Sequence, residues 1–411
     1  MKFVKLMNIL LAVTSLAGCS VSEGSVEILV KNNGDTKRYG EIIEISLDEL
    51  KGKLDGTSQR ISVSDEDGNI VPCQITHDGF LIFQVDVQAQ DSIIYRLTEC
   101  NTTSFDTISC GKVYPEHLDD LAWENDKSGY RAYGPGFQKK GNKGFGYDIL
   151  SKRVSQPVLE QRYSIQFDSV VLSKIITLRK EGKRHEADSI NHLISYHVDH
   201  GNGMDCYNVG PSLGAGTTAL LVDSAIVYPY CYKDVEILDN GPLRFTAQLV
   251  FNPIKVNNNL NVIETRIISL DKGSYLNKTK IKYSGLSDSE TIVSGIVLHS
   301  QNPDGYVLGN DGHYLAYADS TNNTKIDNGV IYVGAVFSSG LLDMNVRLFD
   351  KPQLDAIGHI LAYNTYIPDS TFTYFWGSGW SKNGITSIDE WTKYLKEFTY
   401  NINNPLDIMI R

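Results

Sequence analysis

The feature that most constrains the fold of this chain is the alternation of short β-branched runs with glycine-containing turn pairs. Residues 26–30, 169–172 and 331–336 are three such runs, rich in the residue types that favour strands. Turn pairs punctuate the chain between runs of this kind: Asn33-Gly34, Asp67-Gly68, Asp78-Gly79, Asn240-Gly241 and Asn328-Gly329. Such pairs supply the positive φ angles that tight hairpins need. The pattern predicts a mostly β fold, a large antiparallel β-sandwich, rather than alternating strands and helices.

One segment near the end of the chain has the pattern of a helix. Ser387 is suited to the N-cap and Glu390 follows three residues later, the spacing of a capping box. An apolar stripe at helical spacing comes next: Trp391, Tyr394, Leu395 and Phe398. Asn404-Pro405 is a natural end for this helix. We therefore expect a C-terminal helix beside the sandwich.

The amino terminus has the parts of an export signal. Lys2 and Lys5 precede an apolar run that is too short to span a bilayer. The following Leu16-Ala17-Gly18-Cys19 resembles a bacterial lipobox, in which Cys19 is acylated and becomes the first residue. An ordinary cleaved signal with an incidental cysteine is the alternative. We expect a signal peptide over residues 1–18 and a cell-envelope protein, periplasmic or at the outer membrane, held to the membrane only by the lipid on Cys19.

The charge balance argues against one class of partner. The chain has 38 basic and 49 acidic residues and a net charge of −11, which becomes −13 when residues 1–18 leave with two lysines. Nucleic-acid binding needs a concentrated basic surface. We therefore expect no nucleic-acid partner, and an anionic substrate would need a local cluster of Arg and Lys.

The cysteines that follow Cys19 match no zinc spacing. They are Cys73, Cys100, Cys110, Cys206 and Cys231. In an oxidising compartment Cys100 and Cys110 are the plausible bridge, and the odd total leaves at least one thiol unpaired. We interpret these cysteines as structural.

The length of the chain favours two domains, because it exceeds what most single domains need. No Pro/Ser/Gly-rich linker, low-complexity run or internal repeat divides it after the signal segment. The softest boundary is the polar stretch 99–107. We therefore expect an N-terminal β-region over residues 19–105 and a main β-domain over residues 106–411.

The first segment rich in functional side chains lies between residues 119 and 135. It contains Asp120, Trp123, Glu124, Asn125, Arg131 and Tyr133. An indole face can stack on the C–H groups of a sugar ring, while carboxylate, amide and guanidinium groups bind neighbouring hydroxyls. The segment indicates a sugar site. The alternative is a structural loop in which Glu124 pairs with Arg131.

The second segment covers residues 196–212 and combines two histidines with glycines. In a strand, alternation places His197 and His200 on opposite faces, unless the glycines bend the chain first. A histidine at such a position titrates near neutral pH and can transfer protons. Asp205 and Tyr207 add a substrate-binding carboxylate and a second proton-transfer group. A metal site made of histidine and aspartate, or a purely structural role, is the alternative.

The third segment contains Trp376, Trp380 and Lys382. Two tryptophans that flank glycines form either a stacking platform for a sugar or a packing corner, and the lysine is placed to meet a carboxylate. His299 ends an apolar run and is a further candidate to face a cleft. The sequence has no phosphate-binding glycine loop, no Gly-x-Ser-x-Gly and no His-Glu-x-x-His, so nucleotide chemistry and the commonest hydrolase and zinc-protease signatures find no support.

Several of these stretches together resemble a family of Bacteroidetes envelope lipoproteins of unknown function. They are the motif Asp-Asp-x-Ala-Trp-Glu-Asn-Asp at 119–126, Tyr133-Gly134-Pro135, residues 196–216 and residues 376–382. The resemblance extends from about Ser25 to Arg411. That family is grouped with the galactose-mutarotase-like β-supersandwich domains, which occur in sugar epimerases, polysaccharide lyases and non-catalytic modules of glycosidases. The resemblance therefore implies a supersandwich and a carbohydrate context, and it assigns no catalytic residue.

Two enzyme mechanisms fit these residues. In β-elimination, a neutral His or Tyr removes the proton beside a uronic acid carboxylate, which Arg131, Asn125 or Lys382 neutralises, and a second His or Tyr protonates the leaving oxygen. The proton-transfer candidates are Tyr133, His197, His200 and Tyr207. In glycoside hydrolysis, Glu124 and Asp205 would flank the glycosidic bond.

The opposing class is a lipoprotein that binds a glycan without turnover. Its stacking platforms would be Trp123, Trp376 and Trp380. In every case the expected partner is a glycan. We expect no cofactor, with a bound Ca²⁺ left open.

Overall fold

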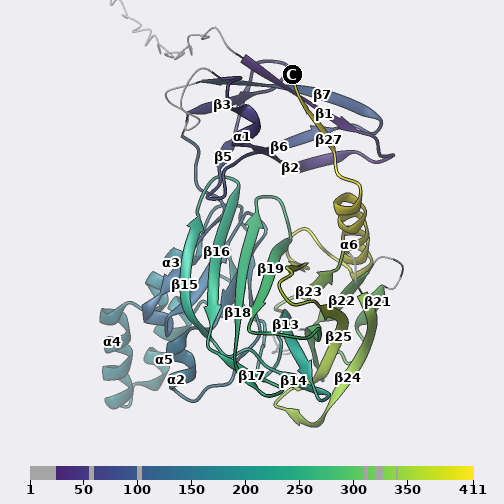
Figure 1. Cartoon of the computed structure of the whole chain (residues 1–411). Coiled ribbons are helices and arrows are strands. Elements are labelled where there is room, and N and C mark those ends of the chain that lie inside the picture. Colours follow the sequence, from purple (N-terminus) through teal and green to yellow (C-terminus); the bar gives the residue numbers. More distant parts are fainter. Residues whose placement is uncertain are drawn as a thin grey trace, which may run out of the picture.

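The computed structural model describes residues 25–54, 60–99, 104–309, 311, 313–320, 327–338 and 341–411. Antiparallel strands dominate these residues, which confirms the mostly β prediction. Figure 1 shows a small N-terminal β-module above a larger body of sheets. The expected signal peptide, the lipid-bearing Cys19 and Cys100 lie outside the described residues. Cys110 is a free thiol, as are the other described cysteines: Cys73, Cys206 and Cys231.

Two small antiparallel sheets form the N-terminal module. Their strand orders are β27-β1-β7-β3-β4 and β2-β6-β5. The elements are β1 (Ser25–Asn32), β2 (Arg38–Ser46), α1 (Leu47–Leu50), β3 (Ile61–Ser64), β4 (Ile70–Val71), β5 (Cys73–Ile75), β6 (Phe80–Val87), β7 (Asp91–Glu99) and β27 (Asp407–Ile410). Alternation along β1 buries Val26, Ile28 and Val30, which share a core with Leu81 and Phe83 of β6. The last strand of the chain completes this module, so it is not continuous in sequence.

Two larger antiparallel sheets form the main sandwich. The first has the order β15-β16-β18-β19-β26-β23-β22-β21, with β17 paired to β18, and the second has the order β14-β13-β20-β25-β24. The first sheet contains β15 (Tyr232–Asp239), β16 (Arg244–Phe251), β17 (Ile254–Val256), β18 (Asn259–Asp271), β19 (Leu276–Ser284), β21 (Tyr306–Gly309), β22 (Tyr314–Asp319), β23 (Ile331–Val336) and β26 (Phe372–Trp380). The second contains β13 (Ala215–Val222), β14 (Ala225–Val227), β20 (Glu290–His299), β24 (Leu341–Gln353) and β25 (Ala356–Tyr366). Buried apolar side chains of both sheets share one core, which confirms the β-sandwich prediction.

A third sheet carries most of the residues that the sequence singled out. Its order is β12-β11-β10-β9-β8. The strands are β8 (Cys110–Tyr114), β9 (Asp120–Glu124), β10 (Ser128–Ala132), β11 (Asp148–Lys152) and β12 (Gly203–Asp205). Trp123 and Tyr130 on one face belong to the core of the main sandwich. Ala122 and Leu150 on the other face pack against Leu159 of α3.

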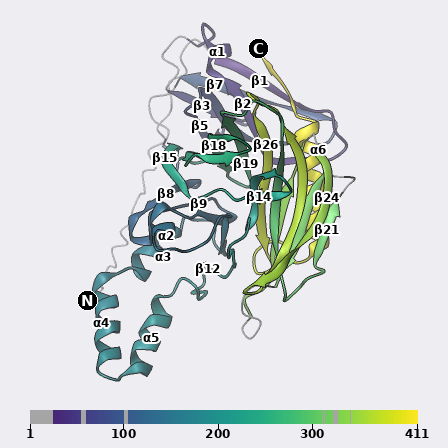
Figure 2. The same ribbon diagram turned by 60° about the horizontal axis from the view of Figure 1, so that its bottom comes forward.

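Helices occur beyond the predicted one, mainly between β11 and β12. Three of them, α3 (Leu159–Gln166), α4 (Ser169–Lys180) and α5 (Arg184–Ile194), form what we call the helical insert. The short η1 (Pro115–His117) and α2 (Pro135–Lys139) lie earlier in the chain. Figure 2 shows α4 and α5 projecting from the body as a hairpin. The strand prediction for residues 169–172 is therefore wrong. Asp168 caps α4 through the backbone N–H groups of Val170 and Val171, and Ile175 packs against Ala187 of α5.

The C-terminal helix is present as predicted. Helix α6 (Ile388–Asn403) begins after Ser387, whose side chain accepts a hydrogen bond from the backbone N–H of Glu390. Trp391 and Leu395 are buried on its inner stripe, and the helix ends before Asn404-Pro405. Within the part of the chain that the structure describes, no helix combines the length and the apolar character needed to cross a membrane.

Candidate functional site

Four charged side chains share one face of the third sheet. Arg131 on β10 is paired in register with Asp148 on β11, and Asp205 on β12 is paired with the residue two positions after Asp148. Asp120 lies two positions before the β9 residue that is paired with Arg131. Side chains two residues apart in a strand point to the same face. The register therefore brings three carboxylates around one guanidinium, beneath the helical insert.

Arg131 lies at the centre of this cluster. Its Nη2 contacts Asp148 Oδ2 closely and lies 3.3 Å from Asp205 Oδ2, and its Nε lies 3.8 Å from Asp120 Oδ2. All four side chains are more than nine-tenths buried. The three carboxylates already occupy the guanidinium, so the expectation that Arg131 neutralises a substrate carboxylate is corrected. The alternative pairing with Glu124 is wrong as well, because the carboxylates that pair with Arg131 are these three.

Asp205 has an unusual proton affinity within the cluster. Burial raises its pKa most and the charge of Asp148 raises it further, so that the pKa is about 6 although Arg131 acts in the opposite direction. Its Oδ2 is buried and has no hydrogen-bond partner among the described residues. Such a carboxyl group is typical of acid–base sites, and buried ion networks can also produce it.

The two tyrosines of the predicted site lie beside this cluster. Tyr133 is half-buried, donates its hydroxyl proton to Asp148 Oδ2 at 2.9 Å and stacks on Phe137 at 4.4 Å between ring centroids. Tyr207 is buried, and its hydroxyl has no partner among the described residues. Burial raises the pKa of both hydroxyls well above the usual value. Both stay protonated at neutral pH, which suits proton donation and not proton abstraction.

Glu124 and Asn125 have structural roles. The Glu124 carboxylate accepts hydrogen bonds from the backbone N–H groups of Val158 and Leu159 at the start of α3, and it pairs with buried Lys152 at 2.6 Å. The Asn125 amide donates to two backbone carbonyls and its oxygen accepts from the turn that follows. Neither side chain is free for a substrate. The predicted hydrolytic pair of Glu124 with Asp205 is therefore wrong.

The three predicted stacking tryptophans are core residues. Trp123 and Trp376 are fully buried and Trp380 is 3% exposed. Their indole N–H groups donate to Asn277, Thr279 and the carbonyl of Asn328, respectively. An enclosed ring presents no face to a ligand, so the expectation of a tryptophan platform is corrected and the packing-corner alternative holds.

Two further predicted residues lie away from the Arg131 cluster. His299 is buried, with its Nδ1 2.8 Å from Asp319 Oδ2 and its Nε2 without a partner among the described residues, so it does not face an open cleft. Lys382 does meet a carboxylate, because its Nζ lies 3.2 Å from Asp327 Oδ2. That partner is exposed and belongs to the protein itself.

A relay of three side chains leads out of the buried cluster. Asp120 Oδ2 lies 2.7 Å from His117 Nδ1, and His117 Nε2 lies 2.9 Å from the hydroxyl of Tyr196. Arg131 Nη1 lies 3.1 Å from the same Nε2. The carboxylate fixes the Nδ1–H tautomer, so Nε2 accepts from the tyrosine and from the arginine. A carboxylate that orients an imidazole, which in turn contacts a hydroxyl, is an arrangement suited to proton transfer.

Sequence reasoning missed His117 altogether. Leu118 and Asp119 both adopt positive φ, at 63° and 62°, which turns the chain so that His117 meets Asp120. Asp is among the residue types that adopt positive φ more often than others, but Leu is not, so the residue types at these two positions do not predict the turn. The contact with Tyr196 spans 79 residues and depends on the helical insert.

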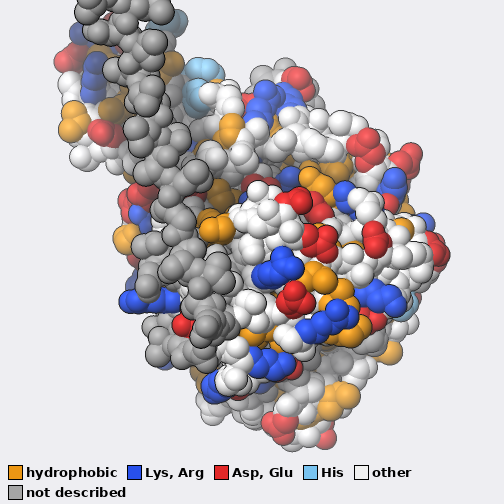
Figure 3. Space-filling view, turned by 90° about the horizontal axis from the view of Figure 1, so that it is seen from above, with side chains coloured by type: hydrophobic (Ala, Val, Ile, Leu, Met, Phe, Trp, Pro, Cys, Tyr) orange, Lys and Arg blue, Asp and Glu red, His pale blue; other side chains and the backbone are white. Residues whose placement is uncertain are grey.

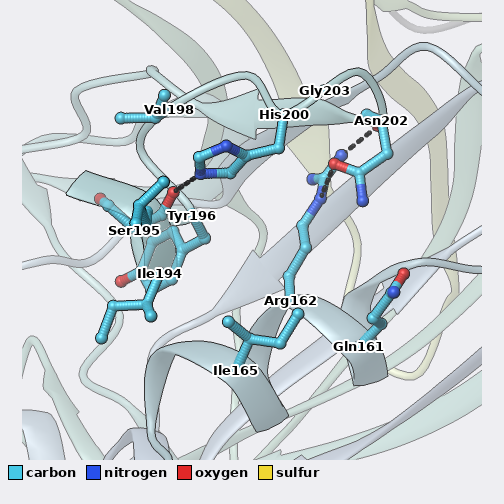
Figure 4. A pocket seen from close by; sticks show the side chains of 11 residues that line it. Gln161, Arg162, Ile165, Ile194, Ser195, Tyr196, Val198, His200, Asn202 and Gly203 are labelled. Carbon is cyan, nitrogen blue, oxygen red and sulfur yellow. Dashed lines mark hydrogen bonds between the residues drawn. The ribbon is translucent and has the colours of Figure 1, made fainter. Parts of the chain in front are cut away.

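A pocket of ≈ 320 Å³ lies between α3 and the loop that follows α5 (Figure 4). Its lining comprises Gln161, Arg162, Ile165, Leu193, Ile194, Ser195, Tyr196, Val198, His200, Asn202 and Gly203. The volume is at the lower end of the range for small-ligand sites. Tyr196 belongs both to this lining and to the relay. The pocket is therefore connected to the Arg131 cluster through one hydroxyl.

Arg162 supplies a cation to this pocket. The side chain is 6% exposed, and its Nε and Nη2 donate to Asn202 and to the carbonyl of Ser151. Its Nη1 has no hydrogen-bond partner, and no carboxylate of the described residues forms an ion pair with it. Burial lowers the pKa of Arg162. A buried guanidinium without a carboxylate is open to an anionic ligand.

His200 lines the same pocket and His197 does not. His200 Nε2 donates to the carbonyl of Ser195 at 3.1 Å, so its Nδ1 carries the lone pair in the neutral ring, and Figure 4 shows this bond. His197 Nδ1 donates to the carbonyl of Asp205 at 2.9 Å. The segment with both histidines is a loop, not the predicted strand. No group of three or more His, Cys, Asp or Glu side chains among the described residues has a geometry that would hold a metal ion.

Comparison with known proteins gives a family and similar chains. The family described as domain of unknown function DUF4861 matches residues 30–408. Uncharacterized protein P7 of Formosa agariphila is 25% identical over 440 residues, covering 100% of both chains. Two solved structures align with this chain at a TM-score of 0.46 each. The first is an alpha-mannosidase from Enterococcus faecalis V583, which is 10% identical, with 95% of this chain and 46% of that chain covered. The second is a protein in the glycosyl hydrolase family 38 from Enterococcus faecalis, which is 9% identical, with 95% of this chain and 48% of that chain covered. The chain spans about half the length of those two proteins.

Proposed function

We propose that this chain, which belongs to the family of domains of unknown function DUF4861, is a carbohydrate-active envelope lipoprotein that cleaves a uronic-acid-containing glycan by β-elimination. The reaction would take place in the pocket between α3 and the loop after α5. One observation carries the proposal. A base, an acid and a cation without a carboxylate partner line the same small pocket, in His200, Tyr196 and Arg162.

The chemistry of β-elimination needs these three groups. A base removes the proton from the carbon beside the uronate carboxylate, and the electron pair left behind forms a C=C bond as the glycosidic C–O bond breaks. An acid gives a proton to the departing oxygen. A cation beside the carboxylate stabilises the negative charge that develops when the proton leaves.

His200 is the base in this scheme. Because its Nε2–H is held by the Ser195 carbonyl, the unshared pair on Nδ1 is available to accept a proton. Of the four residues that the sequence predicted for proton transfer in a lyase, His200 is the one that lines this pocket.

Tyr196 is the acid. Burial raises the pKa of its hydroxyl to about 12, so the group holds its proton at neutral pH. In the reaction the hydroxyl proton leaves its hydrogen bond to His117 Nε2 and goes to the leaving oxygen. The phenolate that remains lies near Arg131, whose charge lowers the pKa of Tyr196. The Arg131 cluster therefore positions and tunes the acid without contacting the substrate.

Arg162 is the group that binds the carboxylate. Its guanidinium is held in place by Asn202 and the Ser151 carbonyl, while Nη1 has no partner. Fixed donors lose little entropy when a ligand binds. Ile165 and Val198 on the same lining give the sugar ring an apolar contact.

The experiment that tests this proposal uses purified protein and a panel of uronic-acid and neutral oligosaccharides. A C=C bond conjugated to the carboxylate absorbs in the ultraviolet, so absorbance is followed together with product chromatography. We expect rising absorbance with a uronic-acid glycan, lost in Tyr196→Phe and His200→Ala and kept in Tyr39→Phe, which changes an exposed tyrosine of the N-terminal module. Products that do not absorb in the ultraviolet would show that the protein is a hydrolase and not a lyase. If every glycan stays intact, the lyase proposal is wrong and the remaining interpretation is a glycan-binding protein without turnover.

A hydrolase remains the second candidate because of one observation. Asp148 and Asp205 both contact Nη2 of Arg131, and the pKa of Asp205 is about 6. Glycoside hydrolysis uses a pair of carboxyl groups, of which the acid has a raised pKa, as Asp205 has. Both lie beneath the helical insert and are buried. In this case Asp205→Asn, not His200→Ala, would abolish product formation.

Envelope location and acylation belong to the same proposal. Their support is the Leu16-Ala17-Gly18-Cys19 stretch after a charged and then apolar segment. Growth with a labelled fatty acid tests the anchor, and we expect label on the wild-type protein and none on Cys19→Ala. Label on neither protein would remove the lipid anchor from the proposal.

A further inference from the structure

A second cavity, of ≈ 810 Å³, lies on the outer face of the sheet β14-β13-β20-β25-β24. Its lining comes from the loop after α2, from β14 and from β24 and β25, and it shares no residue with the pocket at Tyr196. We call it the β24 groove. Its lining residues are Lys143, Phe145, Pro211, Ala225, Ile226, Tyr228, Arg347, Leu348, Phe349, Asp350, Lys351, Gln353 and His359. The volume suits a ligand of a few sugar rings.

The β24 groove is cationic in a chain that is acidic. Lys143, Arg347 and Lys351 line it, against the single carboxylate of Asp350. None of these three cations forms an ion pair with a described carboxylate, and Arg347 donates only to the carbonyl of Ser224, at 2.7 Å. The whole chain has a net charge of −11, and the face in Figure 3 intersperses acidic and basic side chains. Three unpaired cations in one concave site therefore attract an anion.

Aromatic rings alternate with these cations. Along β24, Phe349 lies between Arg347 and Lys351, and all three line the groove. Across the groove, Phe145 and Tyr228 lie 5.0 Å apart between ring centroids. These three rings are half-buried and keep part of their surface open. Rings of this kind stack on the C–H face of a sugar.

His359 gives the groove a polar group without a partner. Its Nε2 accepts a hydrogen bond from the backbone N–H of Leu213 at 3.1 Å, so the hydrogen of the neutral ring is on Nδ1. That Nδ1–H is buried and has no acceptor among the described residues. Burial, with a smaller effect of Arg347, lowers the pKa of His359 to about 3, and the ring stays neutral. The ring is fully buried beneath Phe349, with 5.0 Å between the ring centroids, so His359 supports the aromatic side of the groove.

We infer that the β24 groove binds an anionic oligosaccharide, with its acid groups on Lys143, Arg347 and Lys351 and its ring faces on the aromatic side chains. The anionic character follows from the groove alone, whereas the choice of a sugar rests on the proposed function. The groove would act by binding only, because it holds a neutral, hydrogen-bonded histidine and no acid–base pair. Such a site would hold a long glycan on the protein while another part of it occupies the pocket at Tyr196.

The test is a calorimetric titration of the purified full chain with three oligosaccharides of matched length: a galacturonic acid oligomer, a sulfated oligomer and a neutral one. We expect the anionic oligomers to bind and the neutral one to bind at least tenfold more weakly. Binding should also weaken with added salt. Comparison of the affinities for the galacturonic acid oligomer and the sulfated oligomer shows which anion the groove prefers. Equal affinity for the neutral oligomer, or no binding of either anionic one, would overturn the inference.

Variants place the binding in the groove. Lys351→Glu and Phe349→Ala should each lower the affinity at least tenfold, whereas Lys174→Glu, the same charge change on exposed α4, should leave it within twofold. Equal losses in Lys351→Glu and Lys174→Glu would show a general charge effect and refute the site. Tyr196→Phe separates the two proposals. If the groove binds the glycan but the protein is not a lyase, this variant still binds the anionic oligomer and the wild type shows no turnover. If the protein is a lyase but the groove does not bind the glycan, turnover is lost in Tyr196→Phe and is unchanged in Lys351→Glu.

Discussion

His117 and Tyr196, 79 residues apart in the sequence, meet with their Nε2 and hydroxyl oxygen 2.9 Å apart. The contact joins η1, the short helix between β8 and β9, to the loop that follows α5. On the far side of the imidazole, Asp120 holds Nδ1 at 2.7 Å. This relay links the Arg131 cluster to Tyr196, a side chain that lines the pocket beside α3.

Tyr196→Phe should remove the proposed acid while keeping the ring that packs against Tyr163 and His197. Loss of a positioned proton donor lowers kcat by about 10²- to 10⁴-fold. The lost hydrogen bond should cost only about 1 kcal/mol of unfolding free energy. Initial rates on the uronic-acid substrate and a urea unfolding curve measure the two effects. A rate within twofold of the wild type would show that Tyr196 is not the acid.

Asp205 should make the stability of the protein depend on pH between about 4 and about 6. Its pKa is about 6 in the folded protein and about 3.9 in an unfolded chain, so the folded state holds the proton more tightly. The stabilisation is complete below pH 4 and is lost as the pH rises through 6, by about 2–3 kcal/mol. Other carboxyl groups titrate in this window too.

Comparison with Asp205→Asn isolates that contribution, because the amide resembles the protonated acid and the other groups cancel. We expect unfolding free energies from urea curves at pH 4, 5, 6 and 7 to show the variant gaining stability relative to the wild type as the pH rises. A constant difference across the four pH values would contradict the raised pKa of Asp205.

Glu124→Ala should destabilise the protein strongly. The substitution leaves the ammonium of Lys152, which is fully buried, without its partner at 2.6 Å, and it removes the acceptor for two backbone N–H groups of α3. Breaking one side of a buried ion pair costs about 3–5 kcal/mol. Glu160→Ala is the control, because that carboxylate is 67% exposed and its pair with Lys112 should contribute less than about 1 kcal/mol. Similar losses for the two variants in denaturant unfolding would rule out the structural role of Glu124.

Trp123→Ala should lower stability, not glycan binding as such. The indole is fully buried, stacks on Phe245 at 6.0 Å between centroids and donates to Asn277. Truncation of a core tryptophan costs about 3–5 kcal/mol. The exposed Tyr39→Ala should change the unfolding midpoint little. Loss of glycan binding with an unchanged midpoint would show that Trp123 contacts ligand after all.

The sandwich and helix α6 could be predicted because local patterns and tertiary packing agree there. The cap made by Ser387 and Glu390 is followed directly by the apolar stripe that begins at Trp391, so all the signals for this helix lie in one short segment. The opposite case is α4, where Val170 and Val171 favour a strand. The cap at Asp168 and the packing of Ile175 on α5 outweigh that preference, and neither is visible from strand propensity.

The candidate site could be predicted only in its residue types. Segments 119–135 and 196–207 do meet in space, but the register of the third sheet turns Arg131 toward its own carboxylates and Trp123 into the core. Arg162 could not be expected, since its role depends on contacts with Asn202, forty residues away. An aromatic or acidic residue in a motif shows that chemistry is available, and only the register shows which way it faces.

The pairing of β27 with β1 ties the order of folding to the order of synthesis. Residues 407–410 lie beside residues 28–31, so β1 cannot complete its pairing until a segment far along the chain has been made. Contacts this distant in sequence form slowly. Until then β1 keeps one edge open, and an open edge invites pairing with other chains. In this topology, a chain whose β27 is not yet in place therefore exposes β1 as a site for pairing with another chain.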